Sequence, residues 1–145
     1  MTHTDRSADR CPECAAQRVD GLDCWGQLGQ LIAWEVDDAE LRGVHFLTVA
    51  SYNLQHPARF TDKAIDGLRR SYIDYLDRGI SLAEIRRRAA SAFDGSKRVR
   101  RDGASVRPVL RTWPMTIADV YRDGDPIGAA ERVRRWASAI RSTLG

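Results

Sequence analysis

Apolar residues recur at helical spacing along most of this chain, and no segment shows a sustained alternation of polar and apolar positions. The first such stretch predicts a helix from about Asp23 to Glu35. A second helix is expected from about residue 38 to residue 56, because Asp37 can cap its start and Pro57 disfavours helical geometry in the residue before it. The short link between the two predicts an antiparallel helical hairpin.

Capping signals predict two further helices, over about 61–79 and 81–93. Thr61 can cap the first of them, and Ser81 opens a capping box at the start of the second. A glycine at position 79 is a common helix terminator.

The last part of the chain combines an irregular segment with two more helices. Residues from about 94 to 115 are rich in Arg, Gly and Pro, which predicts a long connection of a kind that is often functional. Thr116 then opens a short helix, and Asp125 followed by Pro126 is expected to cap and start the final one. The fold class that follows is all-α, a small helical bundle.

Length and composition favour one compact domain, since the chain has 145 residues, 43% of them apolar and 30% charged. We expect a disordered tail over 1–10 and a single helical domain over 11–145, with a metal-binding hairpin at 11–57 and the remaining helices at 60–145. No apolar run approaches the roughly 20 residues that span a bilayer, and the polar N-terminus does not resemble a signal peptide. The interpretation is a cytoplasmic protein without a membrane partner.

Three cysteines and two histidines pose the question of a metal site. Cys11 and Cys14 have the CxxC spacing, and an odd number of cysteines in a reducing compartment favours a thiophilic metal over disulfides. His45 and His56 lie eleven positions apart, which is about 16.5 Å along one continuous helix. A zinc-bound histidine keeps its Cα within roughly 6–7 Å of the ion, so the two cannot share one ion unless the helix breaks between them.

The register of the predicted hairpin chooses between the histidines. Folding it at about residue 38 places Cys24 opposite residue 52 or 53, close to His56 and far from His45. The predicted site is therefore a tetrahedral Cys₃His set that is typical of structural zinc. The alternative is a reduced surface turn, a small core cysteine and a histidine at a helix end. The four predicted ligands are Cys11, Cys14, Cys24 and His56.

A polar strip on the same hairpin supplies the candidate catalytic residues. Glu35, His45 and Tyr52 fall on facing sides of the two helices, where apolar residues would be expected. A carboxylate beside an imidazole could orient a general base or help hold a second metal. The alternative is a buried hydrogen-bonded pair without a chemical role.

Residues 86–101 hold seven Lys or Arg against one acid, although the formal net charge of the chain is only +3. Such a stretch could contact phosphates. It has almost no aromatic residues for base stacking, so a solvated face or a small phosphorylated or carboxylated ligand fits better than nucleic acid. A small molecule or a protein is thus the expected partner.

Three segments resemble a bacterial family catalogued as domain of unknown function 5946. They are VHFLTVASYNLQHPARFTD at 44–62, RRR at 86–88 and WPMTIADVYRDGDPIGAAERVRRWA at 113–137. The likeness extends from CPEC at 11–14 to the last helix, and it implies no established activity.

Three hypotheses about function follow from these residues. The first is a zinc-binding helical protein that acts as a binding or accessory module. The second is a small metal-dependent enzyme that uses the cysteine site or the polar strip. The third is a nucleic-acid-associated regulator that uses residues 86–101.

Overall fold

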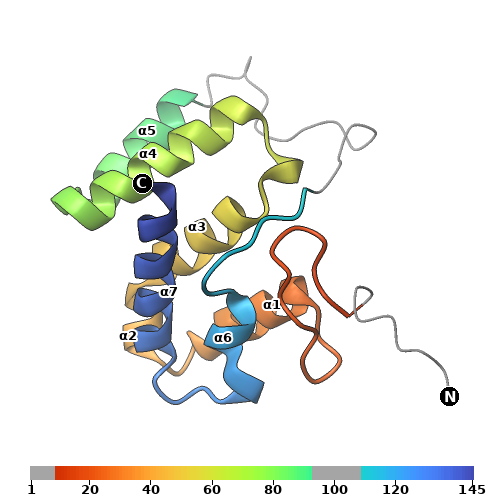
Figure 1. Cartoon of the computed structure of the whole chain (residues 1–145). Coiled ribbons are helices and arrows are strands. Elements are labelled where there is room, and N and C mark those ends of the chain that lie inside the picture. The colour runs from red at the N-terminus through yellow and green to blue at the C-terminus, as the bar shows by residue number, and fades with distance from the viewer. Residues whose placement is uncertain (1–8, 93–108) are drawn as a thin grey trace, which may run out of the picture. The chain divides into compact units, whose positions relative to one another are not determined.

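A computed structural model describes residues 9–92 and 109–145 of the chain (Figure 1). Within these residues the protein is all-α, as predicted, and β-structure is limited to two isolated bridges, Arg10 with Gln17 and Val19 with Leu22. Contacts divide the chain into two compact units, residues 1–55 with 109–145 and residues 56–108. The single domain over 11–145 stays a prediction.

The first unit is built from α1 and α3, which form the predicted hairpin, and from the C-terminal helices. α1 packs against α3 and α6, while α7 packs against α2, α3 and α6 (Figure 1). Its core includes the fully buried side chains of Leu31, Leu41, Ile117, Trp136 and Ile140. The helices of this unit are α1 (Cys24–Trp34), α2 (Ala39–Gly43), α3 (His45–Gln55), α6 (Ile117–Tyr121) and α7 (Ala129–Leu144), and a 3₁₀ turn, η3 (Arg122–Gly124), follows α6.

The helix predicted over 38–56 is in fact two helices, so that prediction was wrong in its first part. α2 ends at Gly43, the backbone of Val44 leaves the helical region (φ −108°, ψ 19°), and α3 begins with the next residue. Asp38, not Asp37, caps α2 by accepting a hydrogen bond from the Leu41 amide (3.0 Å). The glycine at the end of α2 and the β-branched residue after it are both weak helix formers, which explains the break. From His45 to Gln55 the helix is continuous.

The last helix begins three residues later than predicted, at Ala129 rather than Pro126. Asp125 instead forms a local turn, in which its Oδ1 accepts a hydrogen bond from the Ile127 amide (2.9 Å). The side chain of Arg132 then donates to the carbonyls of Val120 (2.8 Å), Ile127 (2.5 Å) and Asp125. The carbonyls of Asp125 and Ile127 are thus held in a non-helical turn by a side chain of α7, which also binds α6 through Val120.

Gln55, the last residue of α3, connects three parts of the first unit. Its Nε2 donates to the Met115 carbonyl (2.8 Å), and its Oε1 accepts from Nε1 of Trp136 in α7 (3.2 Å). Both Gln55 and Trp136 are almost fully buried. The end of α3 is therefore held by buried hydrogen bonds.

The second unit contains η1 (Pro57–Arg59), α4 (Asp62–Arg78) and α5 (Leu82–Ala92). The predicted caps are confirmed, since Thr61 accepts from the Ala64 amide (3.2 Å) and Ser81 from the Glu84 amide (3.0 Å). Gly79 ends α4 with a left-handed backbone (φ 66°).

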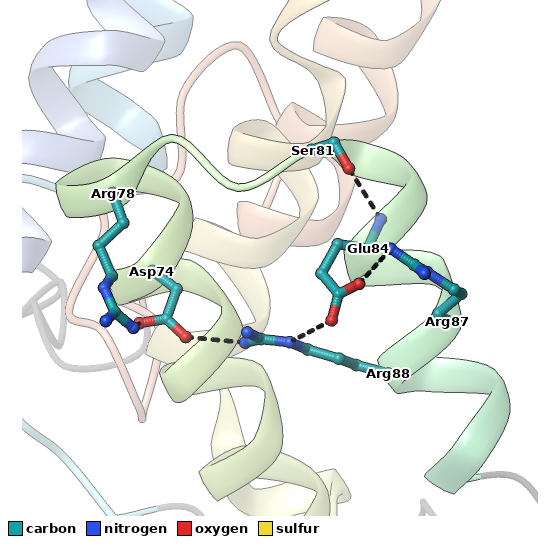
Figure 2. A network of polar contacts seen from close by, with 6 residues as sticks. All are labelled: Asp74, Arg78, Ser81, Glu84, Arg87 and Arg88. Carbon is teal, nitrogen blue, oxygen red and sulfur yellow. Dashed lines mark hydrogen bonds and ion pairs between the residues drawn. The ribbon is translucent and has the colours of Figure 1, made fainter.

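Charged side chains join α4 to α5 (Figure 2). Arg88 donates to Asp74 on the neighbouring helix (2.8 Å) and to Glu84 on its own (3.4 Å). The Asp74 carboxylate is the main cause of the raised pKa of Arg88. Arg87 also pairs with Glu84. Two of the three consecutive arginines at 86–88 are thus engaged within this unit.

Among the described residues, no helix combines the length and the apolar character needed to cross a bilayer.

Candidate metal centre

The Cys11–Cys14 segment forms a tight turn that presents both sulfurs on one side. The Cys11 carbonyl accepts from the Ala15 amide (2.9 Å), and the Cys11 amide donates to the Ala16 carbonyl (2.9 Å). The Ala16 amide points at Sγ of Cys14 (3.4 Å), an N–H···S contact that favours a thiolate at this position. The Arg111 amide also donates to the Glu13 carbonyl (2.9 Å), which joins the turn to the segment before α6.

Ala15 adopts a left-handed backbone (φ 65°) directly after the second cysteine of this turn. A residue with a Cβ is strained there, whereas glycine is not. Ala15→Gly should therefore raise the free energy of unfolding by about 0.5–1 kcal/mol, as measured by chemical denaturation of the metal-loaded protein. Ala33→Gly, an exposed position inside α1, is the matched control and should lower it by about 1 kcal/mol. A loss of stability in both variants would contradict the strain at Ala15.

Cys24 is the first residue of α1, and neighbouring residues fix where this helix begins. Asp23 caps the helix by accepting from the Gly26 amide (2.8 Å). Gln27, fully buried, donates to the carbonyls of Gln17 (2.9 Å) and Leu22 (3.0 Å), so it holds the loop that connects the CPEC turn to α1.

The four predicted ligands come together. The Sγ atoms of Cys11, Cys14 and Cys24 and a ring nitrogen of His56 all lie within 4.8 Å of one another. A tetrahedral zinc site with Zn–S bonds near 2.3 Å has sulfurs about 3.8 Å apart, so this cluster needs only a small contraction to hold an ion. Cys14, Cys24 and His56 are buried and Cys11 is half-buried, which leaves little access for a further ligand.

The neighbouring cysteines favour the protonated form of the Cys14 thiol. Hydrogen bonds with Cys11 and Cys24, together with burial, raise the pKa of the Cys14 thiol far above its usual range. Several buried thiolates are mutually repulsive unless a cation lies between them. A divalent metal ion reverses this effect, because it stabilises the thiolate form of every ligand it binds.

Tyr52 lies with the cysteines. Burial raises the pKa of its hydroxyl, and the neighbouring Cys24 adds to this increase. Its ring contacts the ring of Trp25, with centroids 6.0 Å apart. This confirms the predicted register of the hairpin, in which Cys24 faces residue 52.

Glu35 and His45 form a close pair at the other end of the hairpin. Nδ1 of His45 lies 2.7 Å from Oε2 of Glu35. The Glu35 side chain is 11% exposed and that of His45 is 48% exposed, so the carboxylate is buried behind an imidazole that reaches solvent. Tyr52 is seven residues further along α3, about 10 Å along the helix axis, and lies at the cysteine end of the hairpin.

The basic stretch 86–101 is described only as far as residue 92, and its other residues lie outside the described part of the chain. The described arginines at positions 87 and 88 pair with acids of the same unit.

Sequence reasoning missed the residues that support the cluster. Nothing in the pattern indicated the left-handed backbone of Ala15 or the role of Gln27. Gln55 lies within the 44–62 segment quoted above, and a polar residue beside the apolar face of α3 was a usable signal. Arg132 had a similar signal, because helical spacing places it next to Ala129 and Val133 on the buried face of α7.

No curated protein and no solved structure shows a significant match to this chain. One family model does match, over residues 9–145, and this range includes the CPEC turn, both helices of the hairpin and the C-terminal helices. By this match, the chain belongs to the family of unknown function DUF5946.

Proposed function

We propose that this protein binds one zinc ion as a structural metal and acts as a binding or accessory module. The observation that carries the proposal is the convergence of three cysteine sulfurs and one histidine nitrogen within 4.8 Å. Thiolate and imidazole ligands suit zinc, and four protein ligands leave no open position for a substrate, as is typical of structural sites. A reducing, cytoplasmic environment would keep the thiols available for the metal.

The metal would join the N-terminal segment to the start of α1 and the end of α3. Residues 9–23 are held by turns, isolated bridges and the Gln27 side chain, and they contain no helix. Such a segment buries little apolar surface of its own, so metal binding should contribute a large part of its stability. The surface it stabilises would be the one that recognises a protein or small ligand.

Elemental analysis of protein purified without added metal tests this proposal. We expect about one zinc per chain, because the site offers four protein ligands for one ion. Adding a chelator should make residues 9–23 sensitive to limited proteolysis before the helices are cut. Absence of zinc, or the same cleavage pattern with and without chelator, would contradict a structural metal.

A second candidate function is hydrolysis or proton transfer at the Glu35–His45 pair. The buried carboxylate hydrogen-bonded to a half-exposed imidazole has the geometry of an oriented general base. Tyr52 would take part only through the metal cluster.

The test of this alternative is hydrolysis of p-nitrophenyl acetate by the zinc-loaded protein. If His45 is the base, His45→Ala should lower the rate by about 10²–10⁴-fold while zinc content stays the same. An unchanged rate would end the enzyme proposal, and loss of zinc would show that the wrong histidine was assigned to the metal.

Nucleic-acid binding through residues 86–101 ranks last. The ion pairs of Arg87 and Arg88 with Glu84 and Asp74 weaken it, because paired guanidinium groups release fewer counterions from a phosphate backbone.

A further inference from the structure

An open cavity of about 460 Å³ lies within the first unit. Its walls come from Gln17 and Val19, from α6 and its flanking residues, and from α7. This volume is within the range of roughly 300–1,000 Å³ that is common for small-molecule sites. None of the four candidate metal ligands lines it, so it is a separate feature of the molecule.

A buried positive charge forms part of the cavity wall. Arg132 is 6% exposed, and its guanidinium donates only to backbone carbonyls. In the described part of the chain no ion pair includes this side chain, and burial lowers its pKa, with Asp125 opposing the change. A buried cation without a carboxylate partner is costly, and an anion placed beside it reduces that cost.

Two exposed arginines, Arg122 and Arg135, also line the cavity. The acids that line it are Asp119 and Asp123, so three arginines face two aspartates and the lining has a net charge of +1. The Asp119 carboxylate already accepts a hydrogen bond from the Thr116 amide (2.9 Å). The net positive charge of the lining favours a ligand with a single negative charge.

The backbone is strained at the edge of this cavity. Arg122 (φ 45°) and Asp123 (φ 54°) are consecutive non-glycine residues with left-handed geometry. This geometry is unfavourable for a residue with a Cβ, and residues of this kind cluster at ligand sites. This left-handed backbone turns the chain, and the side chains of both residues border the cavity.

The rest of the lining consists of one polar residue, Gln17, and three apolar ones. Val19, Met115 and Ala118 are half-buried and line the same cavity. These three side chains give the apolar part of a ligand a surface to contact beside the charged groups.

We propose that this cavity binds a small organic anion, a carboxylate attached to an apolar body. The carboxylate would lie between Arg122, Arg132 and Arg135, and the apolar part would contact Val19, Met115 and Ala118. Arginine is suited to this role because its planar fork matches the two oxygens of a carboxylate. The proposal does not depend on zinc.

The experiment is a titration of the full-length, metal-loaded protein with benzoate, followed by amide chemical shifts. We expect saturable shifts at residues 17–19 and 115–123, with a dissociation constant on the order of 1 mM for so small a probe. Neutral benzamide should bind at least about fivefold more weakly, because it lacks the charge, and so should inorganic phosphate, which lacks the apolar body. Equal shifts with benzamide or phosphate would overturn the proposal.

Two neighbouring arginines provide the matched variants. Arg134 and Arg135 both pair with Glu131 (3.9 and 3.5 Å), but only Arg135 lines the cavity. Arg135→Gln should weaken benzoate binding about tenfold, and Arg134→Gln should leave it unchanged. Arg122→Asn, which tolerates the left-handed backbone, should also weaken it. Equal binding by the Arg134 and Arg135 variants, or no saturation by about 50 mM benzoate, would overturn the proposal.

Discussion

Replacing Cys14 by serine is expected to remove the bound zinc and to unfold the segment that precedes α1. Cys14 is 1% exposed and contributes the most buried sulfur of the cluster. Structural zinc sites bind with apparent free energies of about 10–16 kcal/mol, and this energy is available for folding only while the site is intact. We expect the zinc content, measured by elemental analysis, to fall from about one per chain to near zero, and residues 9–23 to lose their dispersed amide signals.

The two histidines of the hairpin give the matched comparison for this result. His56→Ala should reduce zinc content as Cys14→Ser does, because its ring nitrogen belongs to the cluster. His45→Ala should retain zinc, since the continuous α3 separates His45 from His56 by about 16 Å. Zinc loss in the His45 variant with retention in the His56 variant would reverse the ligand assignment.

Replacing Arg132 by methionine is expected to cause the largest loss of stability among single changes away from the metal. The side chain holds the carbonyls of Val120, Asp125 and Ile127, and it is only 6% exposed. Loss of these charge-assisted hydrogen bonds should lower the free energy of unfolding by about 3–5 kcal/mol, which urea denaturation of the metal-loaded protein would measure.

Arg134→Met is the control for this change, because Arg134 lies in the same helix with an exposed side chain and a weak ion pair. It should change stability by less than about 0.5 kcal/mol. If the two variants unfold at the same urea concentration, the carbonyl contacts of Arg132 do not hold the turn between α6 and α7.

The Cys14 and Arg132 predictions concern two different sets of contacts that stabilise the protein. The metal cluster would join the N-terminal segment to the hairpin, whereas Arg132 joins α6 to α7. Gln55 links them, since it donates to the Met115 carbonyl just before α6 and directly precedes the candidate ligand His56. The metal site and the C-terminal helices are therefore structurally connected through one buried amide side chain.

The local chemistry of the sequence was sufficient to predict the helical class and most helix boundaries. Helix caps and terminators act within about four residues along the chain, so they can be recognised in the sequence. This holds for the caps at Thr61 and Ser81 and for the terminator at Gly79. The clustering of His56 with the cysteines was also predictable, because a continuous helix converts sequence separation into distance.

Only the tertiary structure revealed the break at Val44, the late start of α7 and the cavity beside Arg132. Each depends on contacts between residues that are far apart or on a backbone geometry that several local sequences can adopt. The turn before α7 illustrates the reason: proline after aspartate favours a helix start, but the guanidinium of Arg132 binds the carbonyls of Asp125 and Ile127 in another conformation. Buried hydrogen bonds of this kind outweigh a local preference of about 1 kcal/mol, and no periodicity in the sequence encodes them.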